Sequence, residues 1–170
     1  SLLCQWSSFI GAKTIGVVSS DKKVLRIENL GADFSINTEK QNFSNEVMKI
    51  TDGKGADVIY DSVGKDTLHK GLSCLAERGK LVSYVNSAGV IQAVDISLLK
   101  PISGSIICGG LLTFIKNKEE RKNNAKELFN MIANGNLKVD INQRYKLKDI
   151  SDAHDEIESR ITTGSSIILP

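Results

Sequence analysis

The sequence has no apolar run that approaches the roughly 20 residues a membrane-spanning helix needs. Neither sign of charge dominates, since 22 Lys and Arg face 20 Asp and Glu. The first absence argues against a membrane protein, and the second gives no reason to expect a nucleic-acid partner. Ser1 opens directly onto a core-type pattern, so we expect no signal peptide.

Cysteine and histidine are scarce and widely spaced: Cys4, Cys74, Cys108, His69 and His154. A metal site needs these residues in clusters, so we predict none. An odd number of thiols, each in an apolar setting, is typical of buried cysteines in a reducing cytoplasm. The two histidines are expected at the surface or at helix caps.

Strand and helix patterns alternate along the chain. Strands are expected at 14–18, 33–36, 58–60, 80–85, 105–108 and 165–169. Helices are expected at 2–10, 21–30, 43–50, 68–75, 119–134 and 151–161, and most of them end at a glycine. This alternation predicts an α/β fold with a parallel sheet and helices on both faces. A methyltransferase or a flavodoxin-like domain would show a similar pattern.

The same periodicity assigns side chains to the core. The strand at 58–60 is expected to be buried, and so are the apolar stripes of the helices. These stripes include Val24, Leu25 and Leu30, then Ala125, Leu128, Phe129 and Ile132, and finally Ile157 and Ile161.

The first expected strand ends at Ser19 and Ser20, and Lys22 and Lys23 follow inside the next helix. In a dinucleotide-binding fold this position usually carries an acid that holds the ribose hydroxyls of NAD. Hydroxyl and ammonium groups at a helix N-terminus would instead attract a 2′-phosphate, so the strand end suits NADPH. The alternative is an ordinary capped helix with surface lysines. A methyltransferase would want an acid here.

A second polar strand end follows 58–60, where Asp61 and Ser62 precede Gly64. Ligands of open parallel sheets bind at such ends. Asp61 is expected to cap the following loop rather than to act as a general base. We assign no catalytic residue in this chain.

A glycine-rich phosphate loop is also lacking, and it would stand just before the helix that opens at Ser1. In the usual strand order 3-2-1-4-5-6 the strand before that loop is central. We therefore expect a gap between the strands at 14–18 and 58–60, with unpaired backbone groups on both sides. We expect this chain to be a piece of something longer, which folds stably only when the missing part is supplied.

Several separated segments resemble one family in order and spacing: 1–6, 31–37, 61–67, 74–79, 127–129 and 162–170. They are similar to the zinc-free, zeta-crystallin-like quinone oxidoreductases of the medium-chain dehydrogenase/reductase superfamily. The resemblance implies a Rossmann-type doubly wound sheet that lacks its first strand and glycine loop. It assigns residues 1–135 to a partial dinucleotide-binding domain and 136–170 to a segment that returns to the substrate (GroES-like) domain.

The resemblance also implies a function. Members are cytoplasmic enzymes, homodimers at full length, that move a hydride from NADPH to quinones or other activated alkenes without zinc. Position by position, it implies cofactor contacts at Ser19, Ser20, Lys23, Ser62, Tyr84, Asn86, Ser87 and Arg160. Thr38 replaces a family aromatic at the adenine edge, and 108–112 replaces a Thr-Arg-Pro segment. This portion is expected to be inactive alone. An enoyl reductase fragment and a non-catalytic interaction remnant are the alternatives.

Overall fold

The computed structural model describes residues 1–159 and 161–170. Its helices are α1 (Leu2–Phe9), α2 (Asp21–Glu28), α3 (Phe43–Ile50), α4 (Leu68–Leu72), α5 (Leu111–Phe114), α6 (Lys118–Ala133) and α7 (Ile150–Glu158). Its strands are β1 (Ile15–Val18), β2 (Phe34–Asn37), β3 (Ala56–Asp61), β4 (Leu75–Ser83), β5 (Ser105–Cys108), β6 (Ile141–Lys146) and β7 (Ser165–Leu169). None of the helices described is long and apolar enough to cross a bilayer.

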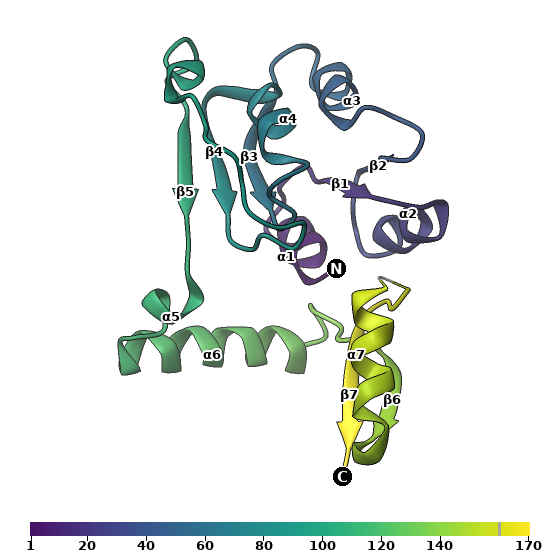
Figure 1. Ribbon diagram of the computed structural model, residues 1–170. Coiled ribbons are helices and arrows are strands. Elements are labelled where there is room, and N and C mark those ends of the chain that lie inside the picture. The colour runs from purple at the N-terminus through teal and green to yellow at the C-terminus, as the bar shows by residue number, and fades with distance from the viewer. Residues whose placement is uncertain (160) are drawn as a thin grey trace.

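The strands form three separate parallel sheets rather than one. β1 pairs with β2, β3 to β5 lie in that order, and β6 pairs with β7. Within residues 1–159 and 161–170 no strand lies between β1 and β3, so each has an edge without a strand partner (Figure 1). This confirms the expected α/β fold with parallel strands and the gap beside the first visible strand.

The strand at 58–60 is covered on one face only and is not buried throughout as expected. Val58 is 46% exposed and Tyr60 56% exposed, whereas Leu81 in the neighbouring β4 is fully covered. Successive side chains of a strand point to opposite faces of the sheet, so Val58 and Tyr60 share one face of β3. Ile59, between them, points to the other face and packs against core residues. Leu81 pairs with Ile59 and lies on that same covered face. Val17 in β1 is also exposed.

One core cluster holds the first two sheets together across this gap. It is built from Ile36, Phe43, Val47 and Cys74. Ile15 of β1 and Ile59 of β3 both pack against it. A second cluster, of Leu68, Leu72, Leu75 and Leu81, lies between α4 and β4. The N-terminal part therefore coheres through side-chain packing rather than through a continuous ladder of backbone hydrogen bonds.

Several helix faces differ from the expected ones. In α2 the buried residue is Ile27, while Leu25 is exposed. Gly16 in β1 is the reason, because it leaves room for the Ile27 side chain: a Cβ there would lie 2.3 Å from Ile27 Cδ1. In α6, Met131 is buried and Phe129 exposed. Ile157 and Ile161 are exposed as well, which contradicts the expected stripe.

The helix expected at 68–75 is shorter and ends at Leu72, since β4 already begins at Leu75. Gly79 therefore lies inside a strand rather than at a helix end. β4 bulges between its two pairings: Ala56 pairs with Leu75, but Val58 pairs with Lys80. The bulge adds residues to β4 that no sequence period signals.

The C-terminal segment forms a unit of its own. β6, β7 and α7 lie together, apart from β3 to β5, and α6 leads to them (Figure 1). The Arg26 guanidinium of α2 contacts the Asp140 carboxylate at 2.7 Å and so anchors this unit. The Gln5 side chain of α1 also exchanges two hydrogen bonds with the backbone of Lys138. The assignment of 136–170 to a substrate domain stays a prediction.

Candidate functional site

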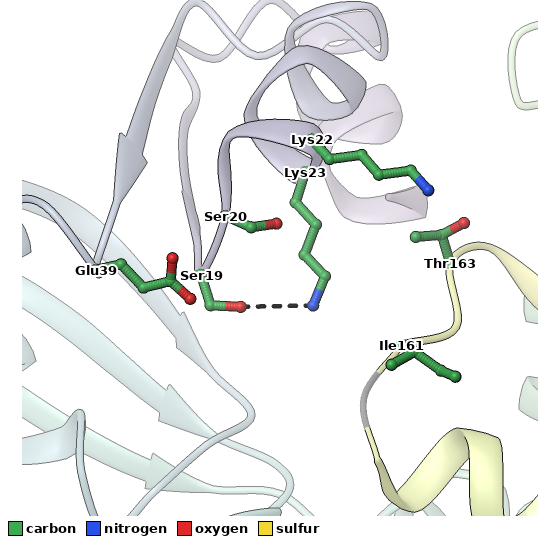
Figure 2. A pocket seen from close by; sticks show the side chains of 7 residues that line it. All are labelled: Ser19, Ser20, Lys22, Lys23, Glu39, Ile161 and Thr163. Carbon is green, nitrogen blue, oxygen red and sulfur yellow. Dashed lines mark hydrogen bonds between the residues drawn. The ribbon is translucent and has the colours of Figure 1, made fainter.

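The carboxyl ends of β1 and β2 lie side by side because the two strands are parallel and in register. Val18 faces Asn37, and the Thr38 N–H donates to the Val18 carbonyl at 2.8 Å. Ser19, the residue after β1, and Glu39, two residues after the end of β2, therefore lie at the same sheet edge. Here a cavity of about 380 Å³ opens, and Figure 2 shows its lining. It is lined by Ser19, Ser20, Lys22, Lys23, Glu39, Ile161 and Thr163.

The structure brings together the three residues predicted to hold the 2′-phosphate. Lys23 Nζ donates to Ser19 Oγ at 3.4 Å, and both face the cavity (Figure 2). Ser20 is the N-cap residue of α2, but its side chain makes no capping hydrogen bond. Its hydroxyl instead lines the cavity, so the alternative of an ordinary side-chain cap does not describe this helix start. Hydroxyls, ammonium groups and a helix N-terminus are groups that favour an anion.

A polar network fixes the turn beside this cavity. Buried Asn37 donates from Nδ2 to Asp21 Oδ1 at 2.8 Å, and Lys40 Nζ contacts Asp21 Oδ2 at 2.5 Å. These hydrogen bonds, that from Lys40 first, lower the pKa of Asp21. Asn37 also accepts from the Glu39 N–H at 3.0 Å. The end of β2 is thus tied to the first residue of α2, and the Asp21 charge is balanced by Lys40.

The far wall of the cavity comes from the C-terminal segment. Ile161 and Thr163 lie on this wall, across the cavity from Lys22 and Lys23 (Figure 2). Arg160, a predicted cofactor contact, lies outside the described residues. Its chain neighbour Ile161 nevertheless lines the same cavity as the predicted phosphate contacts.

Two other predicted contacts lie at a second cavity, of about 270 Å³, at the ends of β4 and β5. Tyr84 and Asn86 line it together with Cys108. Ser62 and Ser87 are not among its lining residues. Their backbones connect the loop after β3 to the loop after β4, because the Ser87 N–H donates to the Ser62 carbonyl at 3.2 Å. The two cavities are distinct, and each lies beyond the carboxyl ends of parallel strands, where such sheets bind ligands.

Asp61 caps the loop after β3, as predicted. Its Oδ1 accepts from the Val63 N–H at 2.8 Å, the Gly64 N–H at 3.1 Å and the Thr67 hydroxyl at 2.7 Å. The residue is buried. Its hydrogen bonds shape the turn that Gly64 continues with φ of +83°. These contacts give Asp61 Oδ1 a structural role.

The thiols only partly follow the prediction of buried cysteines. Cys74 is fully buried, and this burial raises its pKa to about 11. Cys4 is half-buried, whereas Cys108 is exposed at the second cavity. Cys108 is exposed because it is the last residue of β5, at the end of the three-stranded sheet.

Sequence reasoning missed Glu39, Ile161 and Thr163. Glu39 had a usable signal, since it follows the observed β2 by two residues, as Ser20 follows β1. For Ile161 and Thr163 no local pattern could have served. Their place depends on how the C-terminal segment packs against α2, which is a long-range contact.

A family model described as zinc-binding dehydrogenase matches residues 30–168. The chain belongs to this family. A quinone oxidoreductase of Salmonella typhimurium is 42% identical over 99% of the chain and 53% of its own length. The crystal structure of Escherichia coli quinone oxidoreductase complexed with NADPH has a TM-score of 0.94 and 39% identity, over 99% of this chain and 53% of that one.

A 2-haloacrylate reductase of Burkholderia is 34% identical over 99% of the chain and 51% of its own length. The chain thus spans about half the length of the curated relatives it matches. These likenesses confirm the predicted resemblance to quinone oxidoreductases and the Rossmann-like fold of this zinc-binding dehydrogenase family member.

The family description raises the question of zinc. A structural or catalytic zinc ion needs three or four ligands of the Cys, His, Asp or Glu type. Among the residues that the structure describes, no group of three or more such side chains is placed to hold a metal ion. The described side chains do not fit a zinc ion, and the function proposed below uses none.

Proposed function

We propose that this chain is the coenzyme-binding portion of an NADPH-dependent quinone oxidoreductase. The observation that carries the proposal is the cavity at the end of β1, where Ser19, Ser20 and Lys23 converge beside the N-terminus of α2. The quinone oxidoreductase relatives, one of them solved with NADPH, support the same cofactor. Bound NADPH would supply a hydride to a quinone or an activated alkene.

The chain's own residues would hold the two ends of that cofactor. Ser19, Ser20 and Lys23 would bind the 2′-phosphate by charge-assisted hydrogen bonds. Tyr84 and Asn86, at the second cavity, would border the nicotinamide half. Ser62 and Ser87 would support that loop through their backbone hydrogen bond. Arg160 is proposed as a further cofactor contact on the strength of the resemblance alone.

The substrate remains a matter of class. A quinone and a haloacrylate both present a carbon–carbon double bond conjugated to a carbonyl group, so one hydride acceptor type covers both relatives' names. We propose an electron-poor alkene of this kind. The residues that choose among such substrates belong to the part of the relatives that this chain does not span. The cytoplasmic location and the homodimer are likewise proposed for the whole protein.

Calorimetric titration of the chain with NADPH and NADH tests the proposal. We expect NADPH to bind more tightly than NADH, and Lys23→Gln to weaken NADPH roughly tenfold, as the loss of one charge-assisted hydrogen bond does. Lys54→Gln removes a lysine from an exposed turn away from the cavity and serves as the matched control. Binding of neither nucleotide would favour the alternative of a non-catalytic remnant.

A further inference from the structure

The cavity at the end of β1 contains an acid as well as lysines. The absence of a carboxylate directly after the first strand predicted a site that suits NADPH rather than NADH. The structure, however, supplies one from the neighbouring strand, because Glu39 lies beside Ser19 and points toward it (Figure 2). No acid directly follows β1 in the sequence, but the cavity at the end of β1 does contain one.

Glu39 keeps its charge available to the cavity. In the described part of the chain no ion pair joins Glu39 to a lysine or arginine. Lys40, the next residue in the sequence, forms an ion pair with Asp21 instead, with 2.5 Å between Nζ and Oδ2. The Glu39 backbone is fixed through its hydrogen bond to Asn37, so the residue cannot leave the sheet edge without breaking that network.

A carboxylate at this edge has opposite effects on the two forms of a ribose. It accepts hydrogen bonds from free 2′- and 3′-hydroxyls, which is how acidic residues recognise NAD. It repels a 2′-phosphate, which carries close to two negative charges at neutral pH. The lysines favour the phosphate and Glu39 disfavours it, within one cavity.

We propose that Glu39 is a specificity-determining residue. Its charge lowers the preference of this site for a phosphorylated over an unphosphorylated ribose. The inference rests on the proposed function, since it assumes that an adenosine ribose occupies this cavity. With Glu39 present, the site accepts both 2′-phosphorylated and unphosphorylated nucleotides. Without its charge, the site prefers the 2′-phosphorylated nucleotide more strongly.

The test uses two small probes, 2′,5′-ADP and 5′-AMP, which carry only the adenosine end of the cofactor. Calorimetry measures both affinities for the unaltered chain, for Glu39→Gln and for Glu39→Asp. We expect Glu39→Gln to raise the 2′,5′-ADP to 5′-AMP affinity ratio roughly fivefold, the size of an exposed charge interaction. Glu39→Asp, which keeps the charge, should stay near the original ratio. Raised salt should shrink the gain.

Glu127→Gln on the exposed face of α6 removes one negative charge elsewhere and controls for net charge. If the ratio is the same in Glu39→Gln as in the unaltered chain, while Lys23→Gln still weakens 2′,5′-ADP, Glu39 has no such role and the proposed function stands. If the unaltered chain binds neither probe, the proposed function fails and this inference with it.

Discussion

At the residue scale, Cys74 and Cys108 differ in what they can react with. Cys74 is buried in the core cluster with a raised pKa, and Cys108 is exposed at the end of β5. A thiol reacts as its thiolate, and only where reagent can reach it. We expect a thiol reagent at pH 8 to modify Cys108 at once and Cys74 only after unfolding. Peptide mapping of the labelled chain, with Cys108→Ser as the control, checks this.

The Cys74 thiol also predicts how stability depends on alkaline pH. Its folded pKa of about 11 lies above the ordinary value of 9.0. Between these values the unfolded chain loses the proton while the folded chain keeps it, so unfolding is favoured as pH rises. Below pH 9 the contribution is constant. We expect urea melts to show this loss, at most about 2 to 3 kcal/mol by pH 11, and Cys74→Ala to lack it. An equal slope in both proteins would refute the assignment.

At the scale of elements, the loop between β3 and α4 depends on Gly64. Its φ is +83°, and a Cβ there would lie 2.9 Å from Asn86 Oδ1. Gly53 has nearly the same φ, +81°, with no atom within 4 Å of such a Cβ. We expect Gly64→Ala to lower the free energy of unfolding by about 1 to 3 kcal/mol. Gly53→Ala should lower it by about 1 kcal/mol, which is the cost of the left-handed backbone conformation without a side-chain clash.

Urea denaturation of the two variants provides the comparison. Because the added Cβ would push against Asn86 at the second cavity, Gly64→Ala should also weaken NADPH binding, and Gly53→Ala should not. Equal destabilisation by the two substitutions would show that the contact with Asn86 carries no energy.

Elements were largely predictable where a local period or a stop signal acts alone. β5 has its expected bounds, and α3 begins and ends where Phe43 and Gly53 indicated. The predictions were wrong where packing against another element decides which side chains of a helix are buried. Leu25 and Phe129 have ordinary positions in an apolar stripe, yet Ile27 and Met131 are buried instead. The choice depends on the surface each helix meets, such as the space above Gly16, and no helical period contains that information.

In the candidate site, too, the residues placed by local sequence were predictable and those placed by long-range packing were not. Ser19, Ser20 and Lys23 were predictable because one turn places all three at the end of β1. Thr163 was not predictable from a pattern, because it reaches the cavity from a segment more than a hundred residues away in the chain. Glu39 was overlooked because the acid was sought on the wrong strand.

At the scale of the whole molecule, the unpaired edges of β1 and β3 predict self-association. Unpaired strand edges with apolar side chains invite another chain to pair with them. We expect the isolated chain to associate at micromolar concentration and to melt at a temperature that depends on concentration. Val58→Lys, which places a charge on exposed β3, should reduce association, and Val90→Lys, in an exposed loop, should not. Sedimentation velocity and thermal melts measure both. A sharp, concentration-independent melt of a monomer would contradict the prediction that the chain needs a further strand.

The ion pair between Arg26 and Asp140 joins the two walls of the first cavity, since Arg26 stands on α2 and Asp140 at the base of the segment that carries Thr163. A nucleotide that contacted both walls would help to hold them together. By thermodynamic linkage, contacts that hold the walls together would raise the affinity for that nucleotide by the same factor. Breaking the ion pair between Arg26 and Asp140 would then weaken nucleotide binding, although neither residue lines the cavity.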